Sequence, residues 1–208
     1  MDFQLWIAFV SASVALLLIP GPTVILVLSY ALSQGRKVAV ASAAGVALGD
    51  LIAMSVSLMG LGAVVLASAT VFMAIKWVGA AYLVWMGIGM IRAAGAGNTV
   101  LMDAPVLSAG RIFRNAATVT ALNPKSIIFF VAFVPQFIRP DAMLLPQFAI
   151  LIATFVSLAA VNALAYALLG DHLRGAIKRP IVLTWMTRMG GATLIAMGAL
   201  TATLRRAA

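Results

Sequence analysis

The chain has 208 residues, of which 64% are hydrophobic and 9% charged, with a mean hydropathy of +1.13. A soluble domain of this length does not expose so much apolar surface to water, so the composition predicts an all-α membrane protein embedded in the lipid bilayer. The net charge of +9 comes from Lys and Arg residues scattered singly or in pairs, which excludes nucleic acid as a partner and indicates lipid-headgroup contacts. Cysteine is absent from the sequence, and we expect no metal site and no cofactor.

Hydropathy and turn residues predict six transmembrane helices, each long enough to cross a hydrocarbon core of about 30 Å. Their expected ranges are Leu5 to Leu32, Val38 to Ala67, Val71 to Ile91, Ile112 to Phe137, Pro146 to Leu169 and Val182 to Leu204. A cytoplasmic linker, residues 93–110, separates a first three-helix repeat (1–92) from a second (111–208). A further connection is expected from Asp171 to Pro180.

The basic residues predict the orientation of these helices, because loops rich in Lys and Arg stay in the cytoplasm. If both termini lie outside, the outer side holds only Arg139, Arg205 and Arg206, and the other loop residues of this kind face the cytoplasm. We therefore expect both termini outside. With three spans per half, the second half begins on the opposite side from the first, so the halves form inverted repeats.

Proline interrupts the first helix of each predicted repeat near its middle. The residues at these breaks are Pro20, Gly21 and Pro22 in the first span and Asn123, Pro124 and Lys125 in the fourth. A helix in lipid must satisfy its own backbone groups, so a break persists only where protein or a water-filled cavity shields it. Matched breaks in two halves point to the substrate site of a secondary transporter.

The residues around each proline predict where the helix restarts. Asn123 has the side chain of an N-cap and Pro124 suits the first helical position, so a helix should begin at Pro124. Gly21 and Pro22 permit the same arrangement, with glycine as a weaker cap. In inverted halves, both half-helices direct free amides and positive dipole ends toward the membrane centre, which suits a substrate carboxylate. A simple proline kink shielded by neighbouring helices is the alternative.

Asp50 is the only acid expected in mid-membrane, where an ionised carboxylate costs roughly 3 kcal/mol, so it should face the protein interior. At 1.5 Å per residue, Pro22, Asp50 and Lys125 each lie about 16 to 21 Å from basic cytoplasmic residues, which places them at similar depth. We hypothesise that Asp50 carries the coupling proton or meets a substrate ammonium. Lys125 then meets a carboxylate or pairs with Asp50. A structural ion pair and a snorkelling lysine are the alternatives.

Two further pairs of residues share a helix face. Asn162 and Tyr166 are four residues apart, and either line the substrate cavity or bond across helices. Gly45 and Gly49 form a small-residue face that favours close helix packing. Such a face allows a homodimer without requiring one.

Five segments of the chain carry a resemblance to a known family: Ile19 to Pro22, Gly45 to Asp50, Lys76 to Leu83, Asn123 to Lys125 and Phe133 to Phe137. Together they resemble the lysine exporter and threonine/homoserine exporter family of bacterial amino-acid translocators, over essentially the whole chain. The resemblance implies a multi-pass protein of the bacterial cytoplasmic (inner) membrane that exports an amino acid or derivative by proton antiport. Because Glu is absent from the sequence and the membrane centre holds one Asp, neutral substrates such as threonine, homoserine or leucine are favoured.

Two other classes of protein are alternatives to an exporter. An uncoupled membrane channel, or a scaffold subunit, has the same composition but does not couple flux to a gradient. An intramembrane aspartyl protease is a remote alternative, because Gly49-Asp50 resembles half of such a site. That chemistry needs two facing carboxylates, and the other Asp residues lie near helix ends or in loops, so we expect no enzyme.

Overall fold

A computed structural model describes residues 2–19, 21–67, 69–95, 106–139, 142–177 and 180–203. These residues form helices and short connections without a strand, which confirms the all-α prediction. The first half contains α1 (Phe3–Leu18), α2 (Pro22–Gln34), the 3₁₀ turn η1 (Gly35–Val38), α3 (Ala39–Ala67) and α4 (Ala69–Gly95). The second half contains α5 (Ala109–Ala121), α6 (Pro124–Ile128), the π-helical η2 (Phe129–Phe133), the 3₁₀ turn η3 (Val134–Phe137), α7 (Leu144–Ile177) and α8 (Pro180–Thr203).

Both predicted helix restarts are confirmed. Helix α2 begins at Pro22, and its N-cap Gly21 offers no side-chain hydrogen bond. Helix α6 begins at Pro124, and the Oδ1 atom of its N-cap Asn123 accepts a 3.1 Å hydrogen bond from the backbone N–H of Lys125. The chain bends by 41° between α5 and the helical segment that starts at Pro124. Proline rules at each first helical position were sufficient to predict both starts.

The predicted connection from Asp171 to Pro180 is wrong, because α7 remains helical through Ile177. Hydropathy marks where the apolar surface ends, but a hydrogen-bonded helix can continue beyond that point into the polar region. Proline is tolerated at the start of a helix and not in its interior. Pro180 accordingly opens the next helix, α8.

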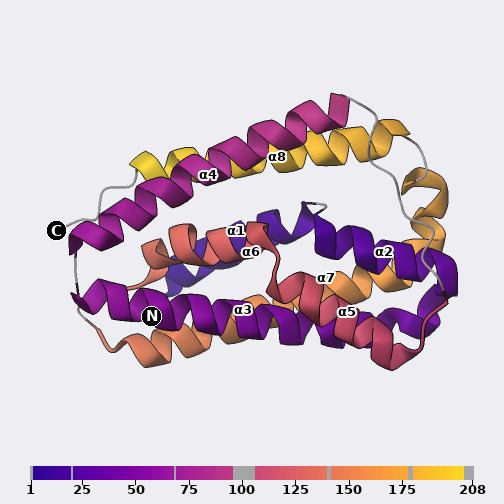
Figure 1. Ribbon diagram of the computed structural model, residues 1–208, viewed down its shortest axis with the longest axis horizontal. Coiled ribbons are helices and arrows are strands. Elements are labelled where there is room, and N and C mark those ends of the chain that lie inside the picture. Colours follow the sequence, from indigo (N-terminus) through magenta and orange to yellow (C-terminus); the bar gives the residue numbers. More distant parts are fainter. Residues whose placement is uncertain are drawn as a thin grey trace.

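The helices of the two halves are interleaved (Figure 1). Helices α4 and α8 pack side by side along one edge, α1 and α6 lie centrally, and α3 contacts both α5 and α7. The α3–α5 contact depends on Gly45 and Gly49, where an added Cβ atom would strike the backbone carbonyls of Phe113 and Ala117 respectively. The predicted packing role of this face is therefore confirmed. The face is occupied within the chain, so it offers no surface to a homodimer.

Apolar side chains cover the outside of the molecule as well as its core. Phe9, Phe129 and Phe130 are fully buried, whereas Val40 is 74% exposed and Trp85 is 67% exposed. So much exposed apolar surface marks contact with another apolar phase. Lipid hydrocarbon is that phase for a membrane protein.

Length and composition identify three helical stretches in the described residues that can cross a membrane: Pro22–Gly62, Trp77–Ala94 and Leu144–Leu169. A fourth is obtained when α5 and the segment Pro124–Phe137 are counted as one bent span. Six spans in two inverted repeats stay a prediction, as does the division of the chain at residues 93–110. Residues 96–105 of that linker lie outside the described residues.

Candidate functional site

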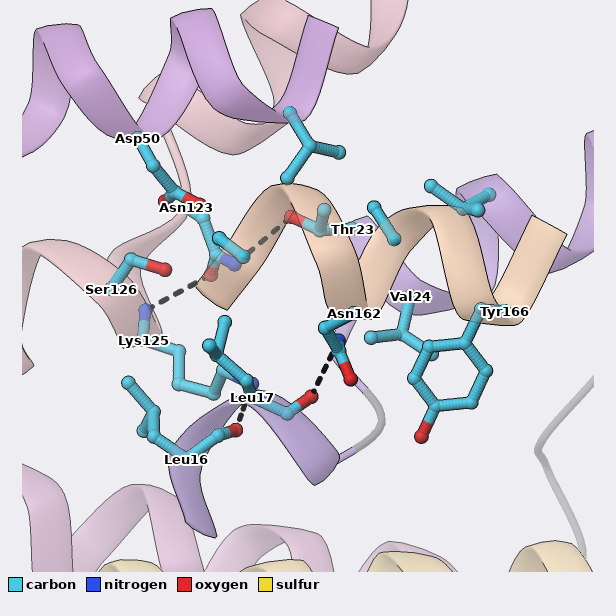
Figure 2. Close-up of a pocket in the computed structure, with 14 residues that line it drawn as sticks. Leu16, Leu17, Thr23, Val24, Asp50, Asn123, Lys125, Ser126, Asn162 and Tyr166 are labelled. Atoms are coloured by element: carbon cyan, nitrogen blue, oxygen red, sulfur yellow. Dashed lines mark hydrogen bonds between the residues drawn. The ribbon is translucent and has the colours of Figure 1, made fainter. Parts of the chain in front are cut away.

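The two helix breaks meet at a small cavity between the halves (Figure 2). Its volume is about 30 Å³, which admits water but not an amino acid. Its polar lining consists of Thr23, Asp50, Asn123, Lys125, Ser126, Asn162 and Tyr166. All the predicted site residues except the break residues Pro20, Gly21, Pro22 and Pro124 are therefore in this lining. Gly21, Pro22 and Pro124 flank it within the breaks, and Pro20 lies outside the described residues.

Lys125 crosses from α6 to the end of α1. Its Nζ atom donates hydrogen bonds of 3.1 Å to the carbonyl of Leu16 and 3.0 Å to the carbonyl of Ile19. The last carbonyls of a helix have no intrahelical partner and form its negative dipole end, so an ammonium group is well suited to them. Space for this crossing comes from Gly21, where an added Cβ atom would lie 3.3 Å from Nζ.

Helix α7 supplies the remaining partners for the end of α1. The Nδ2 atom of Asn162 donates a 3.1 Å hydrogen bond to the carbonyl of Leu17, and the hydroxyl of Tyr166 donates one of 3.3 Å to the carbonyl of Leu18. The four carbonyls from Leu16 to Ile19 thus all accept hydrogen bonds from side chains of the second half. The sequence predicts that Asn162 and Tyr166 either line the cavity or bond across helices. In the structure they do both.

Proline chemistry explains why the end of α1 needs these partners. A helical carbonyl normally accepts from the amide four residues later, and proline has no amide hydrogen. Pro20 and Pro22 therefore leave the carbonyls of Leu16 and Leu18 without their regular donors. Figure 2 shows side chains from α6 and α7 converging on this end of α1.

Asp50 lies on α3, at the other side of the cavity, with its side chain directed toward Asn123 (Figure 2). It is 2% exposed, and its Oδ1 atom has no hydrogen-bond partner in the described part of the chain. Lys125 makes no direct ion pair with Asp50 in the described part of the chain, because its Nζ atom bonds to the α1 carbonyls, but the two charged groups line the same cavity and interact electrostatically. A buried polar atom without a partner is costly and marks a candidate functional group.

Thr23 and Thr120 were missed by the sequence reasoning. The Oγ1 atom of Thr23 lies 3.2 Å from that of Thr120 and accepts a 3.2 Å hydrogen bond from the Nδ2 atom of Asn123. The sequence feature that could have identified Thr23 is its position directly after Pro22, at the start of a helix. The contacts at the two breaks are therefore reciprocal. Thr23, which follows Pro22, contacts Thr120 just before the second break. Lys125, which follows Pro124, contacts Ile19 just before the first break.

The two half-helices differ in the amides that they leave free. At the start of α2, no side chain of the described residues caps the first turn, and Thr23 and Val24 line the cavity. At the start of α6, the amide of Lys125 is bonded to the side chain of Asn123, and the α-helical segment is only five residues long. Of the two positive helix ends expected from the sequence, the end of α2 is the one whose first amides are left without a side-chain cap in the described residues.

Comparisons with known proteins add to this geometry. The profile of the family described as LysE type translocator matches residues 14–204. A homoserine/homoserine lactone efflux protein of Salmonella typhimurium is 37% identical over 207 residues, covering 100% of both chains. An uncharacterized membrane protein of Vibrio cholerae is 35% identical, over 99% of this chain and 100% of the relative. A leucine efflux protein of Klebsiella pneumoniae is 31% identical, over 66% of this chain and 65% of its own. No solved structure matches the chain.

Proposed function

Because the chain belongs to the LysE type translocator family, we propose that it exports an amino acid or a close derivative by proton antiport. Proteins of this family are transporters and not enzymes, so the protease alternative is set aside. Relatives named for the efflux of homoserine, homoserine lactone and leucine support a neutral substrate. The bacterial cytoplasmic membrane is the proposed location.

The observation that carries this proposal is the break between α1 and α2. One side of the break ends in carbonyls, which suit a substrate ammonium, and the other begins with uncapped amides at Thr23 and Val24, which suit a carboxylate. The two charges of an amino acid are separated by a single carbon atom, so a broken helix complements both. Pro20, Gly21 and Pro22 shape this break, and Asn123, Pro124 and Lys125 shape the one facing it.

Asp50 is the proposed proton-coupling residue. It is buried, it lines the cavity, and its Oδ1 atom has no hydrogen-bond partner among the described residues. A carboxyl group in this position can hold a proton, or as a carboxylate it can face an ammonium group, either that of the substrate or that of Lys125 once the substrate has displaced it. Antiport requires that the proton and the substrate do not occupy the site together, and one acid that serves either ligand meets this requirement.

Six spans arranged as two inverted three-helix repeats are the proposed architecture, with both termini outside. Corresponding helices of the halves pack together, α3 with α7 and α4 with α8, which supports a two-fold relation. The reciprocal contacts made by Thr23 and Lys125, each next to a proline, support it as well. In Figure 1 the start of α1 and the end of α8 lie toward the same end of the molecule, as an even number of spans requires.

The cavity volume of about 30 Å³ implies that the break opens before the substrate enters. Alternating access through an inverted-repeat fold moves one group of helices against another around a central site. Helices α1 and α2 are separated from each other only by the break, so they are the elements proposed to move.

Counterflow in proteoliposomes tests the proposed function. Vesicles loaded with unlabelled homoserine, threonine, leucine or lysine are diluted into the corresponding labelled amino acid, with and without an imposed pH gradient. Saturable uptake that responds to the gradient is expected for the neutral amino acids. Non-saturating flux that ignores the gradient would indicate a channel, and no movement of any amino acid or homoserine lactone would contradict the proposal.

A further inference from the structure

We propose that Lys125 is a built-in competitor of the substrate: its ammonium group occupies the substrate-ammonium position on the α1 carbonyls whenever the transporter is empty. The inference rests on the proposed function, since it names the subsite for one end of an amino acid. It also gives Lys125 a role different from the carboxylate binding that its sequence position suggests.

The partners of Nζ are those that an α-ammonium group would use. The carbonyls of Leu16 and Ile19 accept from it at 3.1 and 3.0 Å, and both belong to the broken end of α1. A lysine side chain and an amino acid carry the same chemical group, an ammonium with three donors and no acceptor. Carbonyls that bind the ammonium group of Lys125 are therefore also suited to bind the ammonium group of the substrate. The two groups cannot occupy these carbonyls at the same time.

The remaining charge of the cavity fits an arriving amino acid. Asp50 is 2% exposed and its Oδ1 atom is without a hydrogen-bond partner, so the described lining contains one acid that Lys125 does not contact directly. The uncapped start of α2 lies beside the carbonyls that Lys125 occupies. This follows from the position of Gly21, the N-cap of α2, where an added Cβ atom would lie 3.3 Å from Nζ. An amino acid with its ammonium at the α1 carbonyls thus has its carboxylate next to free amides. Asp50 remains as an acidic partner for the displaced lysine.

The volume and the local structure agree with displacement. The cavity now admits only water, and withdrawal of a lysine with its four-carbon stem enlarges it where the ammonium is needed. Lys125 stands on α6, which has five residues and continues directly into the π-helical segment Phe129–Phe133. π-helical turns are rare and concentrate at functional sites, and such an irregular segment is suited to shift without breaking a long helix.

Lys125→Met tests the inference in the full-length protein in proteoliposomes. Removing the internal ammonium should lower the Kd for homoserine by about tenfold, since the apparent affinity no longer depends on the fraction of sites vacated by the lysine. Counterflow should persist, while net efflux slows at least tenfold because the empty carrier lacks the cation that fills its site. Lys125→Arg keeps a cation at the carbonyls. Its Kd for homoserine should therefore stay within about threefold of that of the unmodified protein.

Acetylation of the substrate provides the matched control. N-acetylhomoserine has no ammonium group, so its Kd should not fall in Lys125→Met. If that variant does not fold, Lys125→Leu is measured in its place, because leucine likewise brings no donor to the carbonyls. An unchanged affinity for homoserine in the folded variant without the lysine charge would overturn the inference. A weaker or absent affinity would also overturn it and would assign Lys125 to the substrate carboxylate. Absence of amino-acid binding by the unmodified protein would instead contradict the proposed function.

Discussion

The two helix breaks are built on the same proline rule but satisfy their backbones in different ways. At the first break, two prolines remove the donors for the carbonyls of Leu16 and Leu18. Those carbonyls accept instead from Lys125 and Tyr166, which belong to the other half of the chain. The carbonyl of Leu16 also accepts a local 3.2 Å hydrogen bond from the amide of Ile19, so the long-range donors are what distinguish this break.

The second break is repaired locally. Pro124 removes the regular donor for the carbonyl of Thr120, and the next available amide, that of Asn123, bonds to it at 3.1 Å. The side chain of Asn123 then caps the new helix by accepting from Lys125. No long-range side chain of the described residues donates to the carbonyls at this end of α5.

This difference suggests that the second break is a rigid part of the molecule and that the first break is a part that moves. A break that is closed by its own neighbours holds its shape when the surrounding helices shift, whereas one closed from the other half is released when the halves separate. We therefore expect substitutions that remove the long-range donors of the first break, Lys125 included, to alter transport, and substitutions of the cap residue Asn123 at the second break to alter mainly stability. The following predictions test this contrast.

The largest effect is expected from filling the glycine face that holds α5 against α3. Gly49→Val places side-chain atoms against the carbonyl of Ala117 and the Cβ atom of Thr120, which forces the helices apart. A loss of about 3 kcal/mol, enough to prevent accumulation of folded protein, is expected from overpacking. Gly60→Val on the same helix has open space around it and serves as the control. Size-exclusion profiles in detergent measure both, and equal folding of the two would contradict the packing argument.

The next largest effect is expected from Asp50→Asn. Coupled transport should fall about 100-fold in a folded protein, because asparagine can neither hold the coupling proton nor carry a negative charge. Efflux driven by a pH gradient in proteoliposomes is the measurement. Asp2→Asn is the matched control, since Asp2 is exposed and caps α1, a role that asparagine fulfils equally well. Normal gradient-driven efflux in Asp50→Asn would remove the residue from the mechanism.

Tyr166→Phe removes one long-range donor from the first break without changing the ring. The carbonyl of Leu18 loses its 3.3 Å hydrogen bond, which should destabilise the closed arrangement by about 1 kcal/mol and change the transport rate about fivefold. Tyr82→Phe, on α4 and in contact with Trp85, is the control for loss of a tyrosine hydroxyl elsewhere. Identical transport rates for both variants and the parent would mean that the first break is no more sensitive than the surface.

The smallest effect is expected at the second break. Asn123→Ser keeps an oxygen that can cap α6 but loses the amide that donates to Thr23, so stability should fall by about 0.5 kcal/mol. Thermal unfolding followed by tryptophan fluorescence detects such a shift. A transport loss greater than tenfold with little change in the unfolding temperature would show that the second break also acts in the transport cycle.

Local rules account for what the sequence predicted well. Helix starts at Pro22 and Pro124, the cap at Asn123 and the packing face at Gly45 and Gly49 each depend on residues within a few positions or on one helix face. The end of α7 was misjudged because hydropathy reports burial in lipid and not the end of a hydrogen-bonded helix. Asp50 and Lys125 do line one cavity, but a direct contact between them could not be predicted, since similar depth in the membrane does not show which nearby acceptors a lysine will bond to.

The sequence by itself determined that the carbonyls of Leu16 and Leu18 would lack their regular donors, because that follows from the covalent structure of proline. It also determined the class of protein, through its apolar composition and its family motifs. Only the tertiary structure decided that Lys125, Asn162 and Tyr166 supply the missing donors. Which side chain reaches the end of α1 depends on how α6 and α7 pack against it, and that packing arises from contacts spread over the whole chain.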